Sequence, residues 1–331
     1  MENNKKFAVI GGGSWATAIA KMLCENQEKI AWYMRSTYAL EHLKHQKHNP
    51  NYLSSVAFDT NKLQLTNDIN EAIKFADVII FAIPSAFLSG ELEKMTESLE
   101  GKTIFSAIKG IVPETSLIVG EHFHTHFNIP YENIGVITGP CHAEEVALER
   151  LSYLTIACAD EEKAKYVAKN VSSYYIKAKT SDDIVGTEYA AVLKNIYSIA
   201  AGIAHGLGYG DNFQAVLMSN AIREMKKFIK KVHKMKRNIN DSAYLGDLLV
   251  TGYSVFSRNR MFGNMIGKGY TVKSAQMEMS MVAEGYYAVK SAYNLNLEYK
   301  AKTPIIDAVY QILYEGKDAK AVFNKLTEKL D

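Results

Sequence analysis

Hydrophobic and polar residues follow different patterns in the two halves of the chain. In the first half, short apolar runs rich in β-branched and aromatic residues are bounded by turn residues, which is typical of buried strands. These runs are FAVIG, KIAWYM, DVIIFAIP, KTIFSAIKG, NIGVITG and LTIACAD. Segments of helical periodicity, such as SWATAIAKMLCEN and SAFLSGELEKM, lie between several of them. The alternation predicts an α/β fold with a parallel, doubly wound sheet and helices on both faces.

The pattern changes near residue 185. From Glu188 onward the chain consists of long helical segments joined by glycine-rich turns, with no convincing strand. A length of 331 residues corresponds to about two domains of ordinary size. We therefore expect an α/β domain over residues 1–185 and an all-α domain over residues 186–331.

Lys194 interrupts the almost wholly apolar segment AAVLKNIYSIAAGIAHG. The residues three and four positions to either side are alanine, tyrosine and serine, so no carboxylate lies at helical ion-pair spacing. Apolar residues surround this helix on all sides, which predicts that it is buried. Burial of an ammonium group lowers its pKa or requires a distant partner. Lys194 is therefore a candidate functional residue, the alternative being a lysine whose amine reaches the domain surface.

Composition and charge exclude several classes of protein. The chain is 47% hydrophobic and 22% charged with a formal net charge of +2, so nothing global indicates a nucleic-acid partner or a membrane surface. Cys24, Cys141 and Cys158 form no CxxC pair, so no disulfide framework or thiolate zinc site is predicted. The polar start MENNKK does not resemble a signal peptide, and the longest strongly apolar run, residues 78–83, is too short to span a bilayer. We expect the protein to reside in the reducing environment of the cytoplasm.

The segment FAVIGGGSWATAIA predicts a strand, a glycine-rich turn and the start of a helix. Gly11, Gly13 and Ala16 occupy the G-x-G-x-x-G/A positions, which allow a tight turn, close approach of the backbone to a pyrophosphate, and helix–strand packing. The helix N-terminus supplies N–H groups to the phosphates. Because this motif follows a strand within a βαβ pattern, we expect a dinucleotide site rather than an ordinary tight turn.

The end of the second apolar run bears on which dinucleotide is bound. An acidic residue about 20 positions past the glycines is typical of NAD sites, whereas an arginine suits the 2′-phosphate of NADP. Arg35 follows this run, and no acid stands there. The sequence thus favours NADP over NAD, unless Arg35 is a surface residue with no cofactor role.

Two further runs end in polar residues where open α/β sheets bind ligands. FSAIKG leaves Lys109 at such an end, and VITGPCHAEEVA places Gly139, Pro140 and Cys141 at another. Lys109 could instead be a solvated lysine at a strand end. Cys141, next to His142, could act as a nucleophile, but no base is assigned to it by sequence.

The segment GDLLVTGYSVFSRNRMFGNMIGKG concentrates polar residues between glycines: Asp247, Thr251, Ser257, Arg258, Asn259 and Arg260. Arginine beside asparagine can hold a phosphate through several directed N–H donors. The alternative is a polar loop between helices with solvated arginines.

Histidine and lysine clusters invite two other interpretations. His42, His45 and His48 recur every three residues, and HFHTHF alternates three more, but zinc sites on helices more often use spacing of four with a further ligand. We expect solvated faces and no metal. MKKFIKKVHKMKRN predicts an amphipathic helix with a basic outer face, for which nucleic-acid or membrane contact is the alternative.

Together, these motifs resemble bacterial NAD(P)-dependent glycerol-3-phosphate dehydrogenase over nearly the whole chain. The blocks that match in order and at similar spacing are GGGSWATAIA, IPSAFL, AIKGI, GPCHAEEVA, LKNIYSIAAGIAHGLGYGDN, GDLLVT, SRNRMFG and VAEGYYAVK. The resemblance implies a Rossmann-type N-terminal domain followed by a helical substrate and catalytic domain. It also implies interconversion of sn-glycerol 3-phosphate and dihydroxyacetone phosphate with NADP or NAD, supplying glycerophospholipid synthesis. A homodimer is left open. We expect neither a nucleic-acid partner nor stable insertion into a membrane.

The resemblance also implies roles for individual residues. The implied cofactor contacts are Gly11, Gly13, Ser14, Trp15, Arg35, Tyr52, Lys109, Ala143, Arg258, Val282 and Glu284. The implied substrate site comprises Lys109, Gly139, Cys141, Lys194, Asp247, Ser257, Arg258 and Asn259. Within it, Lys194 is the implied general acid/base of hydride transfer, Asp247 holds it, and Lys109 polarises or orients the substrate oxygen.

This chain departs from the family pattern at a few positions. Ala16 replaces the usual glycine, and Cys141 replaces the usual serine or threonine, which weakens one hydroxyl hydrogen bond to substrate. TGYSVFSRN also differs from the commoner cysteine–threonine form of this loop. Two other functions remain alternatives: a β-hydroxyacid dehydrogenase, which also places a lysine before an asparagine, and a non-catalytic NADP-binding sensor that keeps the fold.

Overall fold

The computed structural model describes residues 5–279 and 283–331 and divides the chain into two compact units. The first comprises the chain up to Ile108 together with Leu117–Ile184. The second comprises Lys109–Ser116 and Val185–Asp331. The short segment Lys109–Ser116 therefore belongs to the helical unit, although it precedes part of the first unit in the sequence. A single boundary near residue 185 does not describe this segment.

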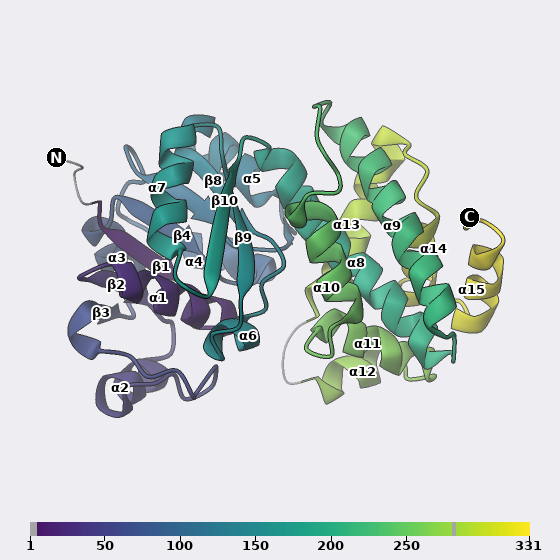
Figure 1. The fold of residues 1–331 in the computed structure, drawn as a ribbon, viewed down its shortest axis with the longest axis horizontal. Helices are drawn as coiled ribbons and strands as arrows, with labels where there is room; N and C mark the ends of the chain where they lie inside the picture. Colours follow the sequence, from purple (N-terminus) through teal and green to yellow (C-terminus); the bar gives the residue numbers. More distant parts are fainter. Residues whose placement is uncertain (1–4, 280–282) are drawn as a thin grey trace. The chain divides into compact units, whose positions relative to one another are not determined.

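An eight-stranded sheet in the order β10-β9-β8-β5-β4-β1-β2-β3 forms the centre of the first unit (Figure 1). Its strands are β1 (Phe7–Ile10), β2 (Ile30–Tyr33), β3 (Leu63–Thr66), β4 (Val78–Phe81), β5 (Thr103–Ser106), β8 (Ile134–Thr138), β9 (Ser152–Cys158) and β10 (Ile176–Ser181). Every apolar run predicted as a strand is one, and the Rossmann-type order around β1 is confirmed. The sequence did not predict β3 and β10. These strands form the two edges of the sheet, and apolar and polar residues alternate along them.

The prediction of a parallel sheet is wrong at one strand pair. β8 pairs antiparallel with β9, although β10 runs parallel to β9 and the strands from β8 to β3 are parallel. The connection between β8 and β9 contains only the short helix α6 (Ala143–Ala147). A parallel return usually requires a longer crossover helix, whereas an antiparallel return does not.

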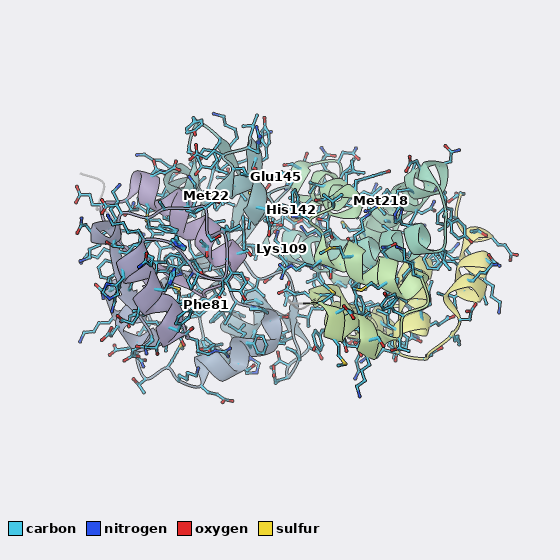
Figure 2. All side chains as sticks on the ribbon, turned by 90° about the horizontal axis from the view of Figure 1, so that it is seen from below. Met22, Phe81, Lys109, His142, Glu145 and Met218 are labelled. Carbon is cyan, nitrogen blue, oxygen red and sulfur yellow. The ribbon has the colours of Figure 1, made fainter. Side chains whose placement is uncertain are left out.

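Helices and short turns connect the strands of this unit. They are α1 (Ser14–Asn26), α2 (Thr37–Gln46), α3 (Ile69–Phe75), α4 (Leu88–Leu92), α5 (Val119–Phe127) and α7 (Glu161–Val171), with 3₁₀ turns at Thr60–Lys62, Ser85–Phe87 and Tyr131–Asn133 and the short strand β7 (Leu117–Ile118). Met22 on α1 and Phe81 on β4 are fully buried (Figure 2). The core therefore includes the apolar face of the helix that begins at the glycine-rich turn.

The second unit is helical apart from β6 (Ile111–Val112) in its described residues (Figure 1). Its helices are α8 (Ile184–Gly206), α9 (Asp211–Val232), α10 (Asp247–Tyr253), α11 (Arg258–Gly267), α12 (Val272–Glu278), α13 (Glu284–Tyr299), α14 (Pro304–Leu313) and α15 (Ala319–Thr327), and a π-helical turn at Ser242–Gly246 precedes α10. Residues 186–204 of α8 are all buried, which confirms the burial predicted from the apolar pattern around Lys194. In the described part of the chain, no helix is long and apolar enough to cross a membrane.

The basic helix predicted over MKKFIKKVHKMKRN ends earlier than expected. α9 stops at Val232, and its last turn holds Lys230 and Lys231, where cations suit the negative end of the helix dipole. Phe228 and Ile229 are buried, whereas the residues beyond Val232 are partly or fully exposed. The buried apolar stripe that packs the helix therefore ends at Ile229, whereas the basic residues continue to Arg237.

Candidate active site

The glycine-rich turn between β1 and α1 has the geometry that a dinucleotide phosphate requires. Gly11 has φ of +139°, and a Cβ there would lie 2.3 Å from the carbonyl oxygen of Ala82. A Cβ at Gly13 would meet no atom within 4 Å, so this face of the turn is open. Gly13 caps α1 without a side-chain hydrogen bond, which leaves the first-turn N–H groups for an anion. The residues present thus fit a pyrophosphate.

A cation and an acid lie close together at the end of β2. The Arg35 side chain is 70% exposed, its guanidinium lies over the Phe87 ring at 5.9 Å, and its nearer nitrogen is 4.0 Å from the Glu91 carboxylate. Glu91 is buried and accepts a hydrogen bond from the Tyr33 hydroxyl. The acid that the sequence lacks at this strand end is therefore supplied by α4, and no sequence pattern indicated it.

The other predicted site residues of the first unit lie in loops and at helix starts. Ser14, Trp15 and Tyr52 are partly exposed, whereas Cys141 and Ala143 are buried, Ala143 as the first residue of α6. Gly139 follows β8 with φ of +121°. The substrate roles of Gly139 and Cys141 stay predictions.

Lys194 and Asp247 form a buried ion pair in the second unit. Their side chains are 4% and 2% exposed, and the lysine Nζ donates to Asp247 Oδ1. Burial lowers the pKa of Lys194 from 10.5 to about 7, Asp247 opposes this shift, and the nearby charge of Lys109 adds to it. The predicted distant partner of Lys194 is thus Asp247, at the first position of α10, directly after the π-helical turn.

Lys109 and Glu284 extend the charged cluster around this pair. The Asn195 side chain, on α8, donates to the Lys109 carbonyl oxygen at 3.0 Å and so ties Lys109 to the helix that carries Lys194. Glu284, at the start of α13, has its pKa raised by burial, an effect opposed by Arg258, Lys109 and Lys194. Asn195 was not predicted as a site residue, although its place directly after Lys194 in the sequence was a usable signal.

The N-terminus of α11 presents directed donors beside buried hydroxyl groups. Ser257 caps the helix by accepting from Arg260 N at 3.3 Å, and its Oγ lies 2.8 Å from that of Ser198. Asn259 Oδ1 accepts from Gly285 N at 2.9 Å, which leaves the amide nitrogen of Asn259 as a donor. Arg258, at the first helical position, is partly exposed. Charge, amide donor and helix N-terminus together suit a phosphate.

Close contact between α8 and α11 fixes the spacing of these groups within the second unit. A Cβ on Gly202 would lie 2.1 Å from Arg260 O, and one on Gly263 would lie 2.1 Å from Ile199 O. Only hydrogen fits at these positions, so the two backbones approach directly. Sequence reasoning missed this contact, although GIAHG and GNMIG both show the G-x-x-x-G spacing that permits it.

Comparison with known proteins identifies the family. Residues 6–164 match the NAD-dependent glycerol-3-phosphate dehydrogenase N-terminus, and residues 183–324 match the C-terminus of the same family. The chain is 33% identical over 323 residues to glycerol-3-phosphate dehydrogenase [NAD(P)+] of Streptococcus uberis, covering 96% of this chain and 94% of that protein. The chain belongs to the NAD-dependent glycerol-3-phosphate dehydrogenase family. The resemblance inferred from the ordered motifs is confirmed.

Other members of the glycerol-3-phosphate dehydrogenase family match over similar lengths. The Bacillus pumilus enzyme is 34% identical over 317 residues, which cover 95% of this chain and 91% of that one. The crystal structure of glycerol-3-phosphate dehydrogenase from Coxiella burnetii has a TM-score of 0.90 at 26% identity and covers 98% of this chain and 99% of that chain. The predicted fold, a Rossmann-type domain followed by a helical one, is therefore confirmed.

One implied cofactor contact, Val282, lies outside the described residues. Within the described ranges, no group of three or more His, Cys, Asp or Glu side chains is arranged to hold a metal ion. His42 and His48 do approach each other, with 3.5 Å between their Nε2 atoms, while His45 lies near Glu41 instead.

Proposed function

We propose that this chain interconverts sn-glycerol 3-phosphate and dihydroxyacetone phosphate with NADP(H) or NAD(H). The observation that carries the proposal is the buried Lys194–Asp247 pair in the same unit as the donor-rich N-terminus of α11. Oxidation removes a hydride from C2 of glycerol 3-phosphate and a proton from its hydroxyl, and reduction returns both. The nicotinamide, when bound, accepts or supplies the hydride. The protein must therefore move one proton and hold one phosphate.

Lys194 is the proposed general acid and base. A lysine whose pKa is lowered to about 7 exchanges a proton readily in either direction near neutral pH. As an ammonium it protonates the ketone oxygen of dihydroxyacetone phosphate, and as an amine it accepts the hydroxyl proton of glycerol 3-phosphate. Asp247 positions the amine, and Lys109 is proposed to orient the reacting oxygen.

Arg258 and Asn259 are the proposed phosphate ligands. The planar guanidinium offers two parallel donors, and the amide of Asn259 adds another because its oxygen is held by Gly285 N. Ser257 Oγ already bonds Ser198 and the helix backbone, so we propose that it shapes this site. Thr251 supports the same assignment, since its buried hydroxyl has no hydrogen-bond partner among the described residues.

The first unit is the proposed dinucleotide-binding unit, with the glycine-rich turn holding the pyrophosphate and Arg35 favouring NADP. We further propose that the chain works in the cytoplasm and supplies glycerol 3-phosphate for glycerophospholipid synthesis. Its small-molecule substrates are the expected partners; a homodimer stays a prediction.

The proposal is tested by following NADPH oxidation through the ultraviolet absorbance of the reduced nicotinamide, with dihydroxyacetone phosphate as substrate, and by repeating the assay with NADH. Short aldehyde acids serve as competing substrates, because a β-hydroxyacid dehydrogenase would prefer them. We expect NADPH to be oxidised with dihydroxyacetone phosphate and not with the aldehyde acids. Preference for the aldehyde acids would favour the hydroxyacid dehydrogenase, and dinucleotide binding without turnover would favour the sensor.

A further inference from the structure

Side-chain and backbone donors hold all the carbonyl groups of the glycine-rich turn. Gly11 O accepts from the Trp32 indole N–H at 2.7 Å, and Gly12 O accepts from Asn49 Nδ2 at 3.0 Å. Gly13 O accepts from both the backbone N and the hydroxyl of Thr17 at 2.9 Å. Three consecutive carbonyl oxygens are thus bonded to other parts of the first unit.

Asn49 connects two of these interactions. Its side-chain nitrogen also donates to Thr17 Oγ1 at 3.0 Å, and its oxygen accepts from Asn51 N at 3.0 Å. The residue is fully buried, as is Trp32, whose ring packs on Phe58 with 5.1 Å between centroids. Both donors therefore act inside the protein and not through water.

These carbonyl bonds determine where the N–H groups of the turn point. In a trans peptide, the C=O and the following N–H point in opposite directions. Holding the oxygens of Gly11, Gly12 and Gly13 therefore directs the N–H groups of Gly12, Gly13 and Ser14 away from those donors. Glycine peptides rotate easily, so without such bonds a carbonyl oxygen could turn toward a bound phosphate and repel it.

We propose that Asn49, together with Trp32, is a positioning residue for the cofactor pyrophosphate. Each acts through a carbonyl of the turn, and neither needs to touch the cofactor. The inference rests on the proposed function only in that the ligand is a dinucleotide, because it concerns binding and not turnover.

The test measures the binding of NADPH and of ADP by calorimetry. ADP carries the pyrophosphate without the nicotinamide. Asn49→Ala leaves the Gly12 carbonyl buried without its donor, and we expect both dissociation constants to rise about 10- to 100-fold. The KM for dihydroxyacetone phosphate at saturating NADPH should stay within about twofold, because the turn is not proposed to bind that substrate. Asn61→Ala, an exposed asparagine of the same unit, is the matched control.

Trp32→Phe keeps an aromatic ring but removes the N–H that holds Gly11 O, and it should produce the same loss of NADPH and ADP binding. This second variant also decides the outcome if Asn49→Ala does not fold. Unchanged dissociation constants in a folded variant would overturn the inference, as would a parallel rise in the KM for dihydroxyacetone phosphate, which would indicate general disruption. Failure of the parent to turn over that substrate would instead count against the proposed function, and the binding result would still stand.

Discussion

Lys194 and Asp247, which are 53 residues apart in the sequence, form an ion pair inside the helical unit. Replacing either partner removes the ion pair that compensates the other buried charge, so the pair should respond strongly to mutation. The balance between burial, which lowers the pKa of Lys194, and Asp247, which raises it, sets that pKa to about 7. This pair therefore leads to specific predictions about the reaction rate and its dependence on pH.

The pH dependence should have opposite signs in the two directions. Reduction of dihydroxyacetone phosphate uses the ammonium form of Lys194, so kcat should fall as pH rises through about 7. Oxidation of glycerol 3-phosphate uses the neutral amine, so kcat should rise across the same interval. Rates measured in both directions with saturating substrates check this. The same sign in both directions would exclude Lys194 as the titrating group.

Lys194→Met should reduce turnover by about 10²- to 10⁴-fold, the usual contribution of a general acid or base, while NADPH binding is retained. Asp247→Asn keeps the shape but removes the charge that opposes the lowered pKa of Lys194. The pH profile of the Asp247→Asn variant should therefore shift to lower pH. Lys226→Met, at an exposed lysine on α9, is the control. Near-parent turnover by folded Lys194→Met would remove this lysine from the mechanism.

Local patterns in the sequence predicted much of the fold. The strand β1, the turn at Gly11 and Gly13, and the start of α1 follow one another within the chain, so neighbouring residues specify them. The apolar surroundings of Lys194 likewise predicted its burial. These features depend on periodicity and turn geometry, which a single segment contains.

Long-range contacts could not be predicted in this way. The isolation of Lys194 implied a distant acid, but the sequence contains 36 Asp and Glu residues and no periodicity that selects Asp247. Only the family resemblance named Asp247 as that acid. Glu91 reaches the end of β2 from another helix, and Asn49 reaches the Gly12 carbonyl from beyond α2. Such pairs depend on how elements pack in three dimensions, which no single segment encodes.

Cofactor preference should depend on Arg35 and Glu91 together. Arg35→Asp replaces the cation proposed to meet the 2′-phosphate, so the dissociation constant should rise more for NADPH than for NADH. Glu91→Gln removes a negative charge 4.0 Å from the guanidinium, so it should improve NADPH binding relative to NADH. Titration of both variants with both cofactors checks this. Equal changes for the two cofactors would mean that neither residue distinguishes the 2′-phosphate.

The proposed phosphate site predicts a substrate-specific loss. Arg258→Lys keeps the charge but loses the planar pair of donors, so kcat/KM for dihydroxyacetone phosphate should fall about 10-fold or more. Unphosphorylated dihydroxyacetone presents no phosphate, so the variant should handle it nearly as the parent does. The ratio of the two kcat/KM values is the decisive quantity. An unchanged ratio would show that Arg258 does not bind the phosphate.

Glu224 should make stability depend on pH independently of catalysis. Its buried carboxylate accepts from Ile305 N at 2.8 Å and Ile306 N at 3.0 Å, and burial raises its pKa from 4.5 to about 8. The folded state retains this proton where the unfolded state has lost it, so the contribution to stability is complete below about 4.5 and is lost as pH rises through about 8. Glu224→Gln has only one amide oxygen for these two N–H donors, so it loses one backbone hydrogen bond at every pH. Because the amide does not titrate, the melting temperature of the variant relative to the parent should nevertheless be higher at pH ~9 than at pH ~6. Equal differences at both pH values would contradict the assignment.

The contact between α8 and α11 should control the spacing between Lys194 and the proposed phosphate ligands. Gly263→Ala adds a methyl group where a Cβ would lie 2.1 Å from the backbone oxygen of Ile199, so one helix must move away from the other. Because α8 carries Lys194 and α11 begins at Arg258, that movement separates the proton-transfer group from the phosphate site. A displacement of about 1 Å can lower the rate by ~10²-fold, so kcat for dihydroxyacetone phosphate should fall and KM should rise.

Overpacking should also destabilise the second unit by about 1–3 kcal/mol, so kinetics are to be measured well below the melting temperature. Gly210→Ala is the matched control, because a Cβ there meets no atom within 4 Å. Binding of ADP should change little in either variant, since the pyrophosphate is proposed to bind at the glycine-rich turn, which belongs to the first unit. If folded Gly263→Ala keeps the parent's kcat and KM, direct backbone contact between α8 and α11 is not what positions the two halves of the substrate site.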